Sequence, residues 1–99
     1  MDRLLTHSLG KSGREVTAVG LGGEGVLRTY GRSAMAAAVV EEAIGQGITY
    51  FDSARAYAGS EEYYGRIWSR RADVRSRIFQ ASKSAARDRA GAEVDLQQT

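Results

Sequence analysis

Short apolar runs rich in β-forming residues alternate with helix-length amphipathic stretches along this 99-residue chain. The runs at 18–21, 48–51 and 78–82 predict strands, and the stretches at 34–46 and 61–71 predict helices. A further helix is expected to begin near Gly91 or Ala92. Strands that alternate with helices of ten or more residues are typical of parallel βαβ units. The pattern therefore predicts an α/β fold built on a parallel sheet.

Turn-forming residues mark the ends of these elements. Residues 4–9 and 15–17 flank a Gly-Lys-Ser-Gly turn, which predicts a β-hairpin ahead of the first parallel strand. Ser33 and Ser60 are the expected N-caps of the two complete helices. Gly47 is the expected left-handed residue after the first of them.

The expected core is small for a chain of this kind. Tyr64, Ile67 and Trp68 form the apolar stripe of the second helix, and we expect Met35 to pack as well. Three parallel strands and an unfinished helix leave open sheet edges. No helix stop signal follows Thr99. These features predict a truncated and marginally stable chain.

Composition excludes several classes of protein. The chain has no cysteine, and His7, expected to be exposed in the hairpin, is its only histidine. Disulfides and thiolate metal sites are therefore excluded, and no metal site is expected. No apolar run approaches the roughly 18 residues of a membrane span, and residues 1–7 lack the apolar stretch of a secretory signal. We expect a cytoplasmic protein without a membrane partner.

Positive charge is concentrated in the last third of a chain whose net charge is only +2. Between Arg66 and Arg89 there are eight cations and two acids. Such a segment could attract phosphate-bearing partners, including nucleic acids. No aromatic residues alternate with these arginines as they do in proteins that stack single-stranded bases, so we do not expect a nucleic-acid partner.

Candidate chemical groups follow the three predicted parallel strands: Gly22 and Gly23, then Asp52, then Lys83. Parallel strands present their carboxyl ends at one edge, where ligands of βαβ proteins bind. Tyr57 lies five residues beyond Asp52. A free tyrosine titrates near pH 10, and a neighbouring ammonium favours its phenolate form. The spacing alone also allows a turn-capping Asp52, a packed Tyr57 and a surface Lys83.

The glycines allow a second interpretation. Gly20, Gly22 and Gly25 have the spacing of a dinucleotide-binding fingerprint, and Asp52 ends the second strand. In that fold a helix opens at the glycines so that its first amides meet the pyrophosphate. Here the next helix is expected only at Ser33, which disfavours this interpretation.

Several segments together resemble the aldo-keto reductase family. They are Leu9-Gly10-Lys11-Ser12-Gly13, Val19-Gly20-Leu21-Gly22-Gly23, Gly47-Ile48-Thr49-Tyr50-Phe51-Asp52-Ser53-Ala54 with Tyr57, and Ile78-Phe79-Gln80-Ala81-Ser82-Lys83. They occur in family order over nearly the whole chain. The Phe-Asp-Ser-Ala-x-x-Tyr element is the most specific of them.

The resemblance implies that residues 1–99 are the N-terminal part of an aldo-keto reductase domain. Its fold would be a (β/α)₈ barrel closed at the bottom by the hairpin, and its activity the NADPH-dependent reduction of an aldehyde or ketone. Tyr57 would be the general acid, supported by Lys83, with Asp52 paired to Lys83. Gly22, Gly23 and Asp52 would contact the nicotinamide ribose region of NADPH.

The same resemblance leaves other outcomes open. The family's catalytic histidine follows the next barrel strand, which lies beyond Thr99, so we expect the 99 residues alone to be inactive. Some family members, such as potassium-channel β subunits, act as cofactor-sensing regulatory subunits. The substrate and the oligomeric state are not predicted.

Overall fold

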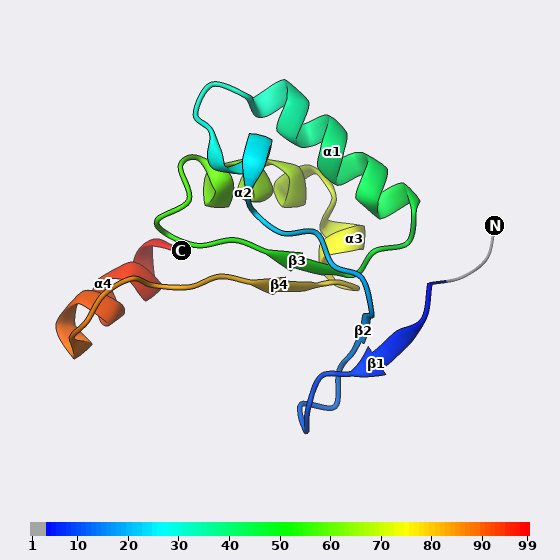
Figure 1. Ribbon diagram of the computed structural model, residues 1–99, viewed down its shortest axis with the longest axis horizontal. Coiled ribbons are helices and arrows are strands. Elements are labelled where there is room, and N and C mark those ends of the chain that lie inside the picture. The colour runs from blue at the N-terminus through cyan, green and yellow to red at the C-terminus, as the bar shows by residue number, and fades with distance from the viewer. Residues whose placement is uncertain (1–3) are drawn as a thin grey trace.

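The computed structural model describes residues 4–99 (Figure 1). Along the chain follow β1 (Thr6–Ser8), β2 (Glu15–Thr17), the 3-10 helix η1 (Gly25–Arg28), α1 (Ser33–Gly45), β3 (Tyr50–Asp52), α2 (Ser60–Arg70), α3 (Ala72–Arg75), β4 (Phe79–Ala81) and α4 (Arg89–Gln98). β1 pairs with β2 antiparallel, and β3 pairs with β4 parallel. The predicted hairpin and the predicted parallel pairing are confirmed.

A third parallel segment lies beside β3. The Leu21 amide donates to the Tyr50 carbonyl, and the Asp52 amide donates to the Leu21 carbonyl, both at 2.9 Å. β4 pairs with the other edge of β3 through the register Phe51↔Gln80. The three segments therefore lie side by side in chain order, with their carboxyl ends at one edge.

The prediction of a full strand at 18–21 is wrong, because only Leu21 forms a bridge. Gly20 approaches β3 so closely that a β-carbon there would lie 3.0 Å from the Tyr50 carbonyl oxygen. Glycine gives a strand no side chain to pack, and the neighbouring Val19 side chain is exposed. The segment passes along β3 as an extended connection.

Helices α1 and α2 cover one face of the β3–β4 pair (Figure 1). Phe51 is fully buried beneath α2, with its ring centroid 5.2 Å from that of Trp68 and 6.0 Å from that of Tyr64. The predicted stripe of α2 is thus confirmed. Met35 is 52% exposed, so its predicted packing is wrong: it lies on the side of α1 away from the buried Ala36 and Val40.

The opposite face of the strands carries Tyr50 and Phe79, which are register partners with ring centroids 5.6 Å apart. Tyr50 and Phe51 therefore point to opposite layers, as strand geometry requires. The Tyr64 hydroxyl, on the helix side, has no hydrogen-bond partner within residues 4–99. Burial, assisted by the charge of Asp52, raises the pKa of Tyr64, so its phenol stays neutral.

The hairpin contacts the amino ends of the parallel strands. Thr17 and Thr49 exchange backbone-to-hydroxyl hydrogen bonds of 3.0 and 3.1 Å. Arg14 donates from Nη2 to the Ile78 carbonyl at 3.2 Å. His7, in β1, is exposed as predicted. The hairpin therefore lies at the edge opposite the carboxyl ends of the strands (Figure 1).

Both predicted serine caps are wrong. Ser33 is the first residue of α1, and the preceding Arg32 makes no capping side-chain bond. Ser60 is the first residue of α2 and is buried, with its hydroxyl bonded to that of Ser53. By contrast, Gly47 has φ +90°, which confirms its left-handed role. The last helix begins at Arg89, two to three residues earlier than predicted, because Asp88 accepts a hydrogen bond from the Gly91 amide.

Residues 4–99 form two two-stranded sheets and no closed barrel. α4 contains no buried residue and lies apart from α1, and its C-terminal end meets α2 through the Thr99–Glu61 hydrogen bond (Figure 1). Its Val94 and Leu96 are exposed. None of the helices in this described part of the chain has the length and apolar character needed to cross a bilayer.

Candidate active site

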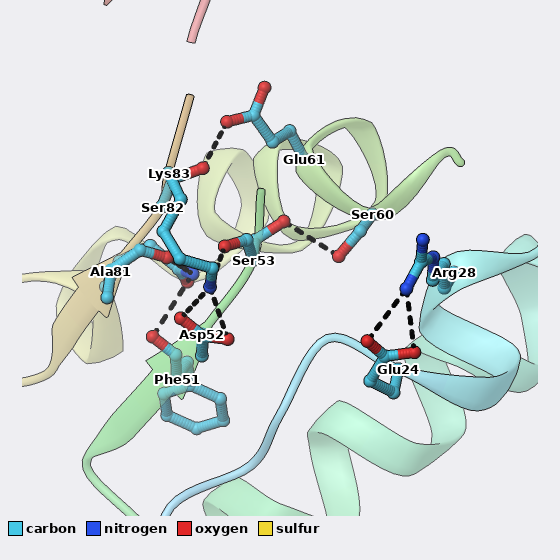
Figure 2. A network of polar contacts seen from close by, with 11 residues as sticks. Glu24, Arg28, Phe51, Asp52, Ser53, Ser60, Glu61, Ala81, Ser82 and Lys83 are labelled. Atoms are coloured by element: carbon cyan, nitrogen blue, oxygen red, sulfur yellow. Dashed lines mark hydrogen bonds and ion pairs between the residues drawn. The ribbon is translucent and has the colours of Figure 1, made fainter. Parts of the chain in front are cut away.

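Asp52 and Lys83 meet where β3 and β4 end (Figure 2). The Lys83 ammonium donates to both oxygens of the Asp52 carboxylate, at 2.6 and 2.7 Å, and to the Ser53 carbonyl at 2.7 Å. Asp52 is the last residue of β3, and Lys83 follows β4 by two residues. The strand register thus places the two predicted residues side by side.

The pair fixes the charge of the lysine. Hydrogen bonding to Asp52 raises the pKa of the Lys83 ammonium above its usual value, although partial burial acts in the opposite direction. The side chain remains half exposed, which screens the effect. At neutral pH this edge therefore carries a protonated, oriented ammonium group.

Tyr57 joins this pair from the loop between β3 and α2. The Lys83 Nζ atom lies 5.1 Å from the centroid of the Tyr57 ring. The loop is held by hydrogen bonds from the Tyr57 amide to the Ala54 carbonyl, at 3.0 Å, and from the Ser60 amide to the Tyr57 carbonyl, at 3.1 Å. The structure therefore brings together the three residues that the sequence singled out for proton chemistry.

The two glycines of the predicted site differ in their surroundings. A β-carbon on Gly23 would lie 2.6 Å from the Asp52 carbonyl oxygen and 2.9 Å from the Tyr57 ring. A β-carbon on Gly22 would meet nothing within 4 Å. Gly23 thus lets its own loop contact Asp52 and Tyr57, while Gly22 leaves open space at the strand end. That space leaves the backbone at Gly22 open to the close approach of a flat ligand.

A polar cavity of about 160 Å³ adjoins Tyr57. Its lining consists of Tyr30, Arg55, Tyr57, Gly59, Glu61 and Glu62. Tyr30 is 75% exposed at the rim. The cavity gives a small polar molecule access to the side of the phenol.

Glu61 links α2 to the strand ends, a role that the sequence did not reveal. It accepts hydrogen bonds from the Ser82 hydroxyl, from Arg55 at 2.9 Å and from Thr99 at 3.0 Å. Partial burial acts to raise the pKa of Glu61, but these donors outweigh it and hold the pKa below its usual value. Its place in the first turn of α2 signalled only a favourable helix dipole.

This pKa shift predicts an acid-dependent contribution of Glu61 to stability. Because the folded-state pKa is lowered, the contribution is present above the ordinary glutamate pKa and is lost as pH falls through the folded value. We expect Glu61→Gln to lower the free energy of unfolding by about 1 kcal/mol at neutral pH and by much less in acid. Urea unfolding across that range measures the difference. Glu62→Gln is the control, since its pairing with Arg66 is exposed, and an equal effect at all pH values would contradict the prediction.

The basic segment is largely paired. Five of its eight cations form ion pairs: Arg66 with Glu62, Arg71 with Glu41 and Asp73, Arg77 with Asp73, Lys83 with Asp52, and Arg89 with Glu93. Carboxylates therefore offset much of the charge that suggested a phosphate-bearing partner.

Comparison with known proteins identifies the class that this fold and site define. The profile of the aldo/keto reductase family matches residues 18–97. Two solved structures from Pseudomonas aeruginosa, each named as a candidate aldo-keto reductase, superpose with TM-scores of 0.76 and 0.75 at 25% and 26% identity. In both cases the alignment covers 98% of this chain and 42% of the other. None of the curated proteins matches the chain.

The chain is thus an α/β protein with a polar site at the carboxyl ends of its parallel strands. It belongs to the aldo/keto reductase family. Members of this family generally use NAD(P)H and act on small carbonyl compounds. This chain spans about two fifths of the length of the solved structures that it matches.

Proposed function

We propose that this chain carries the proton-donating part of an NADPH-dependent reductase of aldehydes or ketones. The observation that supports the proposal is the Asp52–Lys83 ion pair next to the Tyr57 ring. A phenol beside an oriented ammonium is suited to give a proton to a carbonyl oxygen and to tolerate the charge left behind.

Three residues would hold the cofactor. Gly22 leaves open space at the end of its strand segment, Gly23 keeps the loop against Asp52, and the Asp52 carboxylate is one-third exposed at the same edge. NADPH, when bound, supplies the hydride for the carbonyl carbon. The choice of NADPH over NADH is part of the proposal.

The protein's own residues would then manage the proton. The Tyr57 hydroxyl donates its proton to the carbonyl oxygen, which leaves a phenolate. The Lys83 ammonium stabilises that phenolate by its charge, and Asp52 and the Ser53 carbonyl hold Lys83 in position. Preorganised charge at the developing oxyanion is the usual source of most of the rate in such reactions.

The test is carbonyl-dependent oxidation of NADPH by the complete product of the coding sequence that contains this chain. We expect turnover of small aldehydes or ketones, and no turnover by the 99 residues alone. Lys83→Met should lower kcat roughly 10- to 100-fold, because it removes the charge beside the phenol. Lys11→Met is the matched control, since Lys11 is the chain's other lysine and is exposed in the hairpin turn.

Two results would contradict the proposal. An unchanged kcat in Lys83→Met would mean that Lys83 does not take part in the reaction. Tight NADPH binding, measured by fluorescence, without reduction of any carbonyl would instead indicate a cofactor-sensing regulatory subunit.

A further inference from the structure

A second cation lies against the phenol of the candidate site. The Arg28 guanidinium carbon is 4.7 Å from the centroid of the Tyr57 ring, closer than the Lys83 Nζ atom at 5.1 Å. Arg28 ends η1, on the segment that follows the two glycines. Stacking on an aromatic face is favourable for a guanidinium and leaves its edge open to hydrogen-bond acceptors.

Arg28 uses only part of its donor capacity. Its Nη1 atom donates to the two carboxylate oxygens of Glu24, at 2.9 and 3.2 Å (Figure 2). Within residues 4–99, Nε and Nη2 make no hydrogen bond, and the side chain is 46% exposed. The fork of a guanidinium matches the two oxygens of a carboxylate or phosphate.

The segment that carries Arg28 is anchored. The buried Leu27 fixes η1 to the core, and the Thr29 hydroxyl donates to the Gly25 carbonyl at 2.9 Å. The Tyr63 hydroxyl donates to the Thr29 carbonyl and accepts from the Arg32 amide at 3.0 Å. The backbone that carries Arg28 is therefore anchored beside Tyr57.

Glu24 is a weak partner for this arginine. Its side chain is 63% exposed, and exposed ion pairs contribute little to stability. It lies between Gly23 and Gly25, neither of which has a side chain. An anionic ligand can therefore replace the Glu24 carboxylate at little cost.

We propose that Arg28 selects carbonyl substrates that bear an anionic group, a carboxylate or a phosphate, elsewhere on the molecule. This inference rests on the proposed function, because it assigns the substrate class of the same site. The anionic group of the substrate binds the open edge of the guanidinium. The carbonyl group of the same molecule then reaches the Tyr57 hydroxyl. In the absence of substrate, the Glu24 carboxylate binds the guanidinium.

The test compares 4-carboxybenzaldehyde with its neutral methyl ester, methyl 4-formylbenzoate, on the complete gene product. The readout is the ratio of the two kcat/KM values, which general damage to the enzyme does not change. Arg28→Ala should lower the preference for the acid roughly tenfold or more, because a charge-assisted hydrogen-bond pair is lost. Glu24→Gln should raise it, since the competing carboxylate is removed, and a misfolded protein cannot produce that result.

Arg89→Ala is the matched control. Arg89 pairs with Glu93 at the same i,i+4 spacing and is exposed, but it lies in α4, away from the candidate site. Its substitution should leave the substrate ratio unchanged. If Arg28→Ala left the substrate ratio unchanged, the proposal would be overturned. A loss of NADPH affinity in Arg28→Ala would also overturn it, because the guanidinium would then bind the cofactor.

A measurement without turnover separates this inference from the proposed function. Malonate should bind the wild-type protein in a titration followed by chemical shifts of the Arg28 and Tyr57 amides, and Arg28→Ala should abolish those shifts. Malonate binding in a protein that reduces no carbonyl would support the anion site while the proposed reductase activity fails. Absence of malonate binding in an active reductase would overturn the anion site alone.

Discussion

Replacement of Tyr57 by phenylalanine should reduce kcat for carbonyl reduction by about 10²- to 10⁴-fold, the usual contribution of a general acid. The ring would keep its contacts with the Arg28 guanidinium and the Lys83 ammonium, since both cations lie over the ring. Only the proton donor is removed. The affinity for NADPH, measured by fluorescence titration, should therefore change little.

Tyr50→Phe is the control for this experiment. Tyr50 packs edge-to-face against Phe79, its register partner on the strand face opposite α1 and α2. Loss of the Tyr50 hydroxyl should leave kcat within about twofold of the wild-type value, as expected for a substitution that touches no core packing, helix cap or polar network. If Tyr57→Phe also retained most of its activity, another group would have to supply the proton.

The catalytic candidates could be found from sequence because strand ends are predictable. Once parallel strands were expected before Asp52 and Lys83, the geometry of a parallel sheet required their side chains to share one edge. The 2.6 Å contact of Lys83 with Asp52 agrees with that reasoning. Tyr57 needed only a short loop to reach the same edge.

Arg28 could not be found in this way. It lies in a stretch without helical or strand periodicity, and its position depends on η1, on the anchor from Tyr63 and on the close approach permitted by Gly23. These are tertiary contacts between segments about 30 residues apart. No local pattern encodes them.

The wrong helix caps have a related cause. Ser60 has the right residue type for a cap, but the tertiary structure uses its hydroxyl for Ser53, at 2.8 Å. Gly59, at φ +79°, takes the N-cap position instead. When a serine hydroxyl has two available hydrogen-bond partners, tertiary packing decides which one it takes. Residue propensities for the N-cap position do not include that information.

Stability should depend far more on one of the chain's two phenylalanines than on the other. Phe51 has no exposed surface and packs against Tyr64 and Trp68, whereas Phe79 lies partly exposed on the uncovered face. Phe51→Ala should lower the free energy of unfolding of the 99-residue chain by about 3–5 kcal/mol, because it removes a large apolar group and leaves a cavity. Phe79→Ala should cost roughly 1 kcal/mol, the typical effect of a substitution outside a sealed core.

Urea unfolding followed by Trp68 fluorescence and circular dichroism measures both variants. Because a single small domain is stabilised by only about 5–15 kcal/mol, Phe51→Ala is expected to approach complete unfolding without denaturant. Equal losses from the two substitutions would mean that both faces of the β3–β4 pair are equally buried in solution. In that case the face with Tyr50 and Phe79 would be covered as well, and the core would not lie solely beneath α1 and α2.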